Sequence, residues 1–247
     1  MQTQVIAHRG ANKYAPENTL PAFQQAVALG ADILEADMRQ TSDGYIVLSH
    51  DDTINRVANL TGAGVTVEGR TLAQLQAYDF SYIARFGSAY AGTKILTLAD
   101  FLAYAKSVNK EVHIEFKGSG MNHTAAINQV KAAGMLDMTL FCSFNMSDLT
   151  AAYAIEPTAR LAYIYSSVPS GLAVDPAAYA EQYHLAAYYT DMNVMNFDLM
   201  YRCREAGIAV YPWTLNAVTG INTCVAWNVD GICTDDIELV QSLLPSP

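Results

Sequence analysis

Two hydrophobic patterns alternate along the chain. Short apolar runs rich in β-branched and aromatic residues are typical of buried strands, and the longer segments between them carry apolar residues at helical spacing. The expected strands are Gln4–Ala7, Ile33–Asp37, Glu111–Phe116, Thr139–Ser143, Arg160–Ile164, Leu185–Tyr189, Ile208–Trp213 and Gly231–Thr234. The expected helices are Thr19–Leu29, Leu98–Val108, Thr124–Ala133, Ser147–Ile155, Pro176–Gln182, Phe197–Glu205, Ala217–Ala226 and Ile237–Leu244.

Residues that favour helix ends stand where several of these helices should begin or stop. Thr19 is a polar cap before Pro21, and a proline in the first turn loses no hydrogen bond because that N–H has no helical partner. Gly30, Gly134 and Gly207 follow three of the helices, and glycine readily adopts the left-handed conformation that ends a helix. The repeated order of strand, helix, glycine and strand is typical of parallel α/β units.

Eight such units account for the length of the chain. At roughly 30 residues each they occupy about 240 residues, and a (β/α)8 TIM barrel typically takes about 250. We therefore expect residues 1–247 to form a single TIM barrel domain. A doubly wound open sheet is the alternative fold, but no G-x-G-x-x-G motif follows the first strand.

One region departs from this repeat. Asp43-Gly44 predicts a hairpin turn between the strand at 34–38 and a return strand at 45–49. The segment that follows, about 51–95, contains five glycines and no clean strand–helix unit. We interpret it as an insertion after the second strand, placed over one mouth of the barrel.

The composition excludes several classes of protein. Of 247 residues, 51% are hydrophobic, which is too many for a disordered chain, and the net charge of −10 argues against a nucleic-acid binder. No apolar run approaches the roughly 18 residues that suggest a membrane span, and the first residues lack the features of a secretory signal. Four cysteines without a C-x-x-C pair favour free thiols, so we expect a cytoplasmic protein. They are Cys142, Cys203, Cys224 and Cys233.

Carboxylates gather at the predicted carboxyl ends of the strands, which is where the active site of a barrel lies. Glu35 and Asp37 point to the same side of one strand, and Glu115 and Lys117 repeat that spacing on another. Three carboxylates held close repel one another unless a cation or a proton intervenes, and they suit Mg²⁺ or Ca²⁺ better than zinc. The alternative is a buried ion pair with Arg9 or Lys117.

Two histidines follow strands at the same end. Of His8 and His50, one could take a proton while the other gives one near neutral pH, and the sequence does not assign the two roles. Their place beside the carboxylates favours catalysis over a structural role. Asp51 and Asp52 follow His50; they could orient its ring, but capping a turn is the more common role for such residues.

Positive and aromatic side chains complete this set. Arg9 and Lys117 could bind a phosphate, or they could simply balance the charge of the three acids. A metal, two cations and two histidines together suit the cleavage of a phosphate ester. Trp213 and the run 141–144, which contains two phenylalanines, could form an apolar wall for a substrate or could fill the core.

These residues belong to an ordered set of motifs that resembles the glycerophosphodiester phosphodiesterase family. The set runs from residue 8 to residue 235, so the resemblance covers nearly the whole chain. Each short motif alone is weak evidence, whereas the order of all of them is specific. The motifs are His8-Arg9-Gly10, Pro16-Glu17-Asn18-Thr19, Gly30-Ala31-Asp32, Glu35-x-Asp37, Thr41-x-Asp43-Gly44, His50-Asp51, Glu115-Phe116-Lys117, Ser143-Phe144, Trp213-Thr214-Leu215-Asn216 and Asp230-Gly231-Ile232-Cys233-Thr234-Asp235.

The resemblance implies a (β/α)8 barrel with a small insertion and a metal-dependent phosphoric diester hydrolase. The implied reaction converts a small-molecule glycerophosphodiester, such as glycerophosphocholine or glycerophosphoethanolamine, to sn-glycerol 3-phosphate and an alcohol. One divalent cation, Mg²⁺ or Ca²⁺, is implied as the cofactor. The residues that the resemblance assigns are Glu35, Asp37 and Glu115 for the cation, His8 and His50 for acid–base catalysis, and Arg9 and Lys117 for the phosphate.

Two other functions remain as alternatives. A lysophospholipase D or sphingomyelinase D-like enzyme would use the same histidines and a metal, with an apolar mouth for acyl chains. For such a mouth the insertion offers Phe80, Tyr82, Ile83 and Phe86. A non-catalytic phosphate-binding barrel would have lost one of the chemical positions, and all of them are present. The sequence leaves the oligomeric state open.

Overall fold

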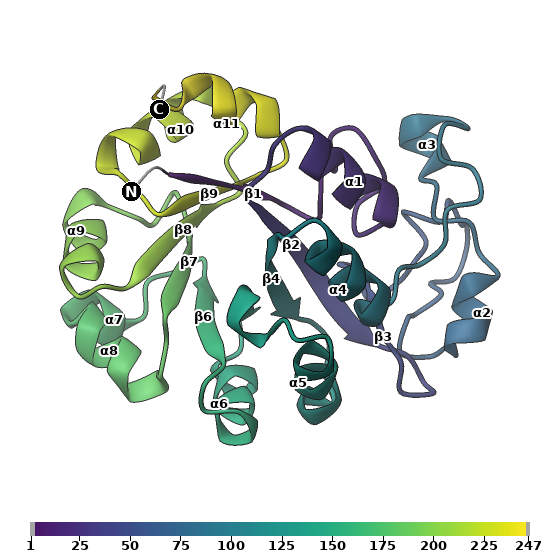
Figure 1. The fold of residues 1–247 in the computed structure, drawn as a ribbon, viewed down its shortest axis with the longest axis horizontal. Coiled ribbons are helices and arrows are strands. Elements are labelled where there is room, and N and C mark those ends of the chain that lie inside the picture. Colours follow the sequence, from purple (N-terminus) through teal and green to yellow (C-terminus); the bar gives the residue numbers. More distant parts are fainter. Residues whose placement is uncertain (1–2, 246–247) are drawn as a thin grey trace.

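Eight parallel strands and the helices between them form a nearly closed barrel in the computed structural model, which describes residues 3–245 (Figure 1). The strands are β1 (Gln4–Ala7), β2 (Ile33–Gln40), β3 (Ile46–Leu48), β4 (Glu111–Phe116), β5 (Thr139–Ser143), β6 (Arg160–Tyr165), β7 (Ala187–Asp191), β8 (Ala209–Trp213) and β9 (Gly231–Thr234). The helices are α1 (Leu20–Ala28), α2 (Leu72–Gln76), α3 (Ile83–Phe86), α4 (Leu98–Ser107), α5 (His123–Ala132), α6 (Met146–Ile155), α7 (Ser170–Val174), α8 (Pro176–Tyr183), α9 (Phe197–Glu205), α10 (Val218–Trp227), α11 (Ile237–Leu243) and the 3-10 helix η1 (Leu136–Met138).

The order of the strands confirms the predicted (β/α)8 barrel. Parallel neighbours run β8-β7-β6-β5-β4-β2-β1-β9, and β3 adds to β2 as an antiparallel return strand, as the hairpin predicted. Two backbone N–H groups join β8 to β9: Leu215 donates to the carbonyl oxygen of Cys233 at 3.0 Å, and Val210 donates to the Asp230 carboxylate at 2.8 Å. The alternative of an open doubly wound sheet is therefore wrong.

The apolar side chains form two layers, one inside the barrel and one between the strands and the helices. On β2, Leu34, Ala36 and Met38 belong to the outer layer, which packs against the helices. The residues between them therefore face the interior, and these are Glu35 and Asp37. Strands buried on both faces are expected in a parallel sheet covered by helices. The alternation places two carboxylates inside the barrel, as their spacing predicts.

The segment between β3 and α4 has a small apolar core of its own. Figure 1 shows its two short helices, α2 and α3, to one side of the barrel beyond β3. Neither helix was expected; α2 begins with a capping box in which Thr71 and Gln74 bond each other's backbone N–H. The segment also contacts the loop before α1, because the Tyr90 hydroxyl donates to the Tyr14 carbonyl at 2.7 Å. The core consists of Val47 of β3 together with Ile54, Ala58, Val67, Leu75, Phe80 and Ile95 of the segment.

Most element ends agree with the sequence patterns. The eight predicted strands and eight predicted helices are present among residues 3–245, with strand ends within three residues and helix ends within one. The cap of α1 differs: the Thr19 hydroxyl donates to the carbonyl oxygen of Pro16 and makes no bond to the helix. No helix in the described part of the chain is long and apolar enough to cross a membrane.

Gly10 should be intolerant of any side chain. Its φ is +80°, and an added Cβ would lie 2.8 Å from the carbonyl carbon and the Cβ of Ala22 in α1. We expect Gly10→Ala to lose more than about 2 kcal/mol of unfolding free energy in urea denaturation, because left-handed strain costs roughly 1–2 kcal/mol before any clash. Gly44→Ala is the matched control, since φ is +87° there but the nearest atom, Gln40 Nε2, is 3.7 Å away. Equal losses in both variants would contradict a close approach of α1.

Candidate active site

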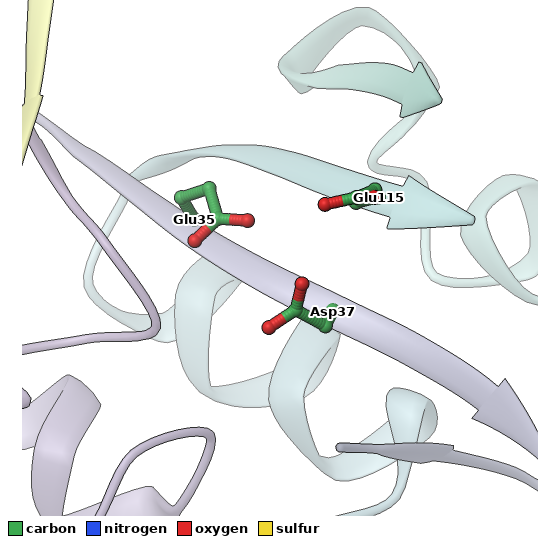
Figure 2. A group of neighbouring side chains, drawn as sticks. All are labelled: Glu35, Asp37 and Glu115. Carbon is green, nitrogen blue, oxygen red and sulfur yellow. The ribbon is translucent and has the colours of Figure 1, made fainter. Parts of the chain in front are cut away.

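Three buried carboxylates meet at the carboxyl ends of two neighbouring strands. Glu35 and Asp37 extend from β2 and Glu115 extends from β4, and the strand register places Asp37 directly opposite Glu115. Figure 2 shows the three groups turned toward one another. One oxygen from each lies within 4.8 Å of the other two. The structure therefore brings together the three residues that the sequence suggested as metal ligands.

Two cationic side chains lie against this acidic cluster. Lys117 Nζ is 2.8 Å from Glu115 and 3.6 Å from Asp37, and Arg9 Nε is 3.2 Å from Asp37. The backbone N–H of Arg9 donates to Glu35 at 2.8 Å. The ion pairs that were the alternative to a metal site are thus present. They leave three carboxylates against two cations, so the cluster retains an excess negative charge.

The pKa values of the three carboxyl groups are shifted in different directions. Burial raises the pKa of Glu35 from 4.5 to about 7 and that of Glu115 from 4.5 to about 8, and repulsion from Asp37 acts in the same direction. Although burial opposes it, Arg9 and Lys117 hold the pKa of Asp37 below its usual range. Buried carboxylates that resist ionisation in this way are stabilised by a hard cation with oxygen ligands. The cluster could therefore hold a divalent metal ion.

Each histidine is held by a carboxylate on Nδ1. His8 Nδ1 lies 2.7 Å from Asp235, and His50 Nδ1 lies 2.8 Å from Asp51. Among the described residues, neither Nε2 atom has a hydrogen-bond partner, so both remain available to a ligand. The sequence favoured a turn-capping role for Asp51, and the structure instead supports the other interpretation, in which Asp51 orients the ring.

The pKa values of the two imidazoles are shifted in opposite directions. For His8, burial lowers the pKa, but the hydrogen bond to Asp235 and the charge of Glu35 outweigh it and raise the pKa above its ordinary value. Burial lowers the pKa of His50, against the attraction of the Asp37 carboxylate. At the same pH, His8 is therefore protonated to a greater extent than His50.

The sequence did not identify the residues that hold these groups in place. Asn18, at φ +54°, donates to the Asp37 carboxylate at 2.9 Å and accepts from the Asp37 backbone N–H at 3.1 Å. Asn12 and Asn216 donate to Asp235 from either side. These contacts link positions 19 to more than 200 residues apart, so no local spacing reveals them. The only sequence signal was the presence of Asn18, Asn216 and Asp235 in the recognised motifs.

A cavity of about 110 Å³ opens above the acidic cluster. Of the eight predicted site residues, all except Asp37 line it, and Asp37 lies buried beside Lys117. The opposite wall is apolar. The lining residues are His8, Arg9, Glu35, His50, Glu115, Lys117, Cys142, Phe144, Ile164, Tyr189, Trp213, Thr214 and Cys233.

The aromatic wall differs in part from the prediction. The Phe144 and Trp213 rings meet edge to face at 5.6 Å on the cavity wall, and Lys117 Nζ lies 5.6 Å above the Phe144 ring. Phe141, in contrast, stacks on Phe116 in the outer core, so for Phe141 the core-filling alternative holds. Phe80 is buried in the core of the inserted segment and is unavailable for an apolar mouth.

Comparison with known proteins identifies the family. The sequence model of the glycerophosphoryl diester phosphodiesterase family matches residues 8–239. The chain belongs to this family. It is 32% identical to a glycerophosphodiester phosphodiesterase from Caldanaerobacter subterraneus subsp. tengcongensis, over 99% of this chain and 98% of the relative.

Solved structures support the same assignment. A phosphodiesterase from Oleispira antarctica, solved in complex with the product sn-glycerol-3-phosphate, superposes with a TM-score of 0.88. It is 26% identical in sequence, and the match covers 98% of this chain and 96% of that one. The resemblance seen in the sequence motifs is thereby confirmed, and the protein is an enzyme of a phosphoric diester hydrolase family.

The phosphodiesterase should become less stable as the pH rises when no metal is bound. Unfolded glutamates release their protons near 4.5, whereas Glu35 and Glu115 release theirs at about 7 and about 8 in the folded state. Between these values the folded chain binds more protons, so the free energy of unfolding falls as the pH rises. A divalent cation replaces these protons, and we expect its stabilising effect to be larger at about pH 8 than at about pH 6.

Thermal melts with EDTA, Mg²⁺ or Ca²⁺ measure both effects. Glu35→Gln should flatten the pH dependence of the metal-free protein and abolish the shift in Tm that the metal causes. Glu205→Gln, at the exposed end of α9, is the control and should change neither. A metal-induced shift that survives Glu35→Gln would show that the cation binds elsewhere.

Proposed function

We propose that this enzyme hydrolyses small glycerophosphodiesters to sn-glycerol 3-phosphate and an alcohol, with one divalent cation, Mg²⁺ or Ca²⁺, as cofactor. The observation that carries the proposal is the arrangement of two carboxylate-backed histidines and an acidic cluster around one cavity. The product bound to the relative from Oleispira antarctica supports the same substrate class.

Glu35, Asp37 and Glu115 would hold the cation. When bound, it offsets negative charge on a non-bridging phosphate oxygen. Arg9 and Lys117 border the same cavity and would bind the phosphate, where their positive charges stabilise the additional charge of the transition state. Both already contact the carboxylates, so their positions are fixed before the substrate arrives.

We propose that His8 is the general acid and His50 the general base. His50, with its lowered pKa, is ready to take a proton from the nucleophile, which is either water or the neighbouring glycerol hydroxyl; the hydroxyl would form a cyclic phosphate that water then opens. His8, with its raised pKa, is ready to give a proton to the departing alkoxide. Asp51 and Asp235 accept hydrogen bonds from Nδ1, which fixes the ring orientation and directs both Nε2 atoms to the substrate.

The cavity dimensions favour a small substrate. The cavity of about 110 Å³ has room for several water-sized groups, which suits a polyol or a short alcohol. Trp213 would contact the substrate, because it lies on the wall and its buried Nε1 has no partner among residues 3–245. All four cysteines are free thiols, which supports the expected cytoplasmic location.

The roles of the histidines can be separated by the leaving group. His8→Ala and His50→Ala should each lower turnover of glycerophosphocholine by roughly 10²–10⁴-fold without unfolding the protein. With a p-nitrophenyl ester of glycerol phosphate, the leaving group departs without a proton. His8→Ala should then recover most of its activity, whereas His50→Ala should not. Recovery in His50→Ala alone would reverse the assignment.

Release of sn-glycerol 3-phosphate tests the proposed reaction and its cofactor together. Glycerophosphocholine and glycerophosphoethanolamine are incubated with enzyme in Mg²⁺, Ca²⁺ or EDTA, and a lysophospholipid is tested in parallel. We expect release from the small diesters with at least one metal and none in EDTA. Activity on the lysophospholipid alone would favour the lipid phosphodiesterase, and unchanged activity in EDTA would contradict a metal cofactor.

A further inference from the structure

Arg56, in the segment between β3 and α4, binds two carboxylates at once. Its Nη1 and Nη2 atoms lie 2.6 and 2.9 Å from the two oxygens of Glu17, and its Nε lies 2.8 Å from Asp51. The paired contact with Glu17 is the parallel geometry in which a guanidinium binds a carboxylate most strongly. One side chain of the insertion therefore connects the loop before α1 with the residue that follows His50.

Each of these carboxylates also contacts a residue of the proposed machinery. Asp51 uses its other oxygen, Oδ1, to bind His50 Nδ1 at 2.8 Å. Glu17 accepts a third hydrogen bond, from Arg9 Nη1 at 3.1 Å. The chain of contacts runs from His50 through Asp51, Arg56 and Glu17 to Arg9. Arg56 is its central member and contacts neither the acidic cluster nor the main cavity.

The Glu17 end of this series of contacts is buried, whereas the Arg56 and Asp51 side chains are 35% and 32% exposed. The Glu17 side chain is only 7% exposed, and the cavity beside it measures about 10 Å³, which is room for at most about one water molecule. Burial alone raises the pKa of Glu17, but the hydrogen bond from Arg56 and the charge of Arg9 outweigh it, so the group stays ionised. Without Arg56, a buried carboxylate would depend on Arg9 alone.

We propose that Arg56 is a positioning residue that fixes His50 through Asp51 and Arg9 through Glu17. Arg9 stands between two acids, Glu17 at 3.1 Å and Asp37 at 3.2 Å. Loss of Arg56 would strengthen the pull of Glu17 on Arg9 and draw the guanidinium away from the phosphate. Loss of Arg56 would also free Asp51 to rotate, and the His50 ring would rotate with it. This inference rests on the roles proposed above for His50 and Arg9.

Three substitutions separate the two series of contacts that start at Arg56, one through Asp51 to His50 and the other through Glu17 to Arg9. We expect Asp51→Asn to lower mainly kcat, since it affects the orientation of His50, and Glu17→Gln to raise mainly KM, since it affects Arg9. Arg56→Ala should do both, with kcat lower by about 10- to 100-fold, because small displacements of reacting groups cost this much. The effect of Arg56→Ala on kcat should largely disappear in the Asp51→Asn background.

Conservative and matched variants exclude a merely structural role. Arg56→Lys keeps the charge but has no planar fork, so it should retain only part of the activity, and added guanidinium should partly restore Arg56→Ala. Arg85→Ala is the control: it lies in the same segment, is exposed, and forms no ion pair among the described residues. Its kcat and KM should equal those of the unmodified enzyme.

The orientation of His50 can be read without turnover. In a ¹H–¹⁵N spectrum of the histidine rings, His50→Ala assigns the His50 signal, and its Nδ1 proton should exchange faster in Arg56→Ala than in the unmodified enzyme. An unchanged His50 signal together with unchanged kcat and KM would overturn the inference, as would a loss of thermal stability with normal kinetics below the Tm. If the unmodified enzyme cleaves no glycerophosphodiester, the proposed function fails, and the ring spectrum still decides whether Arg56 positions His50.

Discussion

The repulsion among three carboxylates buried at one end of the barrel is the constraint on which the site depends. One carboxylate oxygen each of Glu35, Asp37 and Glu115 lies within 4.8 Å of the other two, and all three residues are buried. Arg9 and Lys117 offset part of this charge, and the pKa values of Glu35 and Glu115 are raised to about 7 and about 8 by burial and by the remaining repulsion. Carboxyl groups with such shifted pKa values are typical of functional sites. A divalent cation that binds a phosphate would offset the repulsion among these three.

The surrounding charges give different pKa values to two histidines that have the same kind of hydrogen-bond partner. Each imidazole has a carboxylate on Nδ1, and the rings differ mainly in what else surrounds them. Burial favours the neutral form of both rings; at His8 the hydrogen bond to Asp235 and the charge of Glu35 outweigh it, whereas at His50 the positive charges of Arg9 and Lys117 add to it. At one pH, His8 can therefore be protonated and donate a proton while His50 is neutral and accepts one. This division is typical of sites in which two similar groups perform opposite proton transfers.

Local patterns in the sequence were sufficient for the barrel and for the residues that face its interior. Strand periodicity alone places Glu35 beside Asp37 and away from Leu34, and the structure agrees. The short helices α2, α3 and α7 were missed because segments of four or five residues carry too little periodicity. Arg56 was missed for a different reason: its partner Glu17 is 39 positions away, and only the folded chain brings the two together.

In the proposed mechanism, a metal ion and a phosphate meet between the acidic cluster and the two histidines. Crystals grown with Mn²⁺ and sn-glycerol 3-phosphate would test it most directly, because anomalous scattering locates the metal without assumptions about its ligands. We predict one anomalous peak about 2.0–2.6 Å from oxygens of Glu35, Asp37 and Glu115, with the phosphate within hydrogen-bond distance of His8 and His50. A metal at another position, or a phosphate bound away from both histidines, would contradict it.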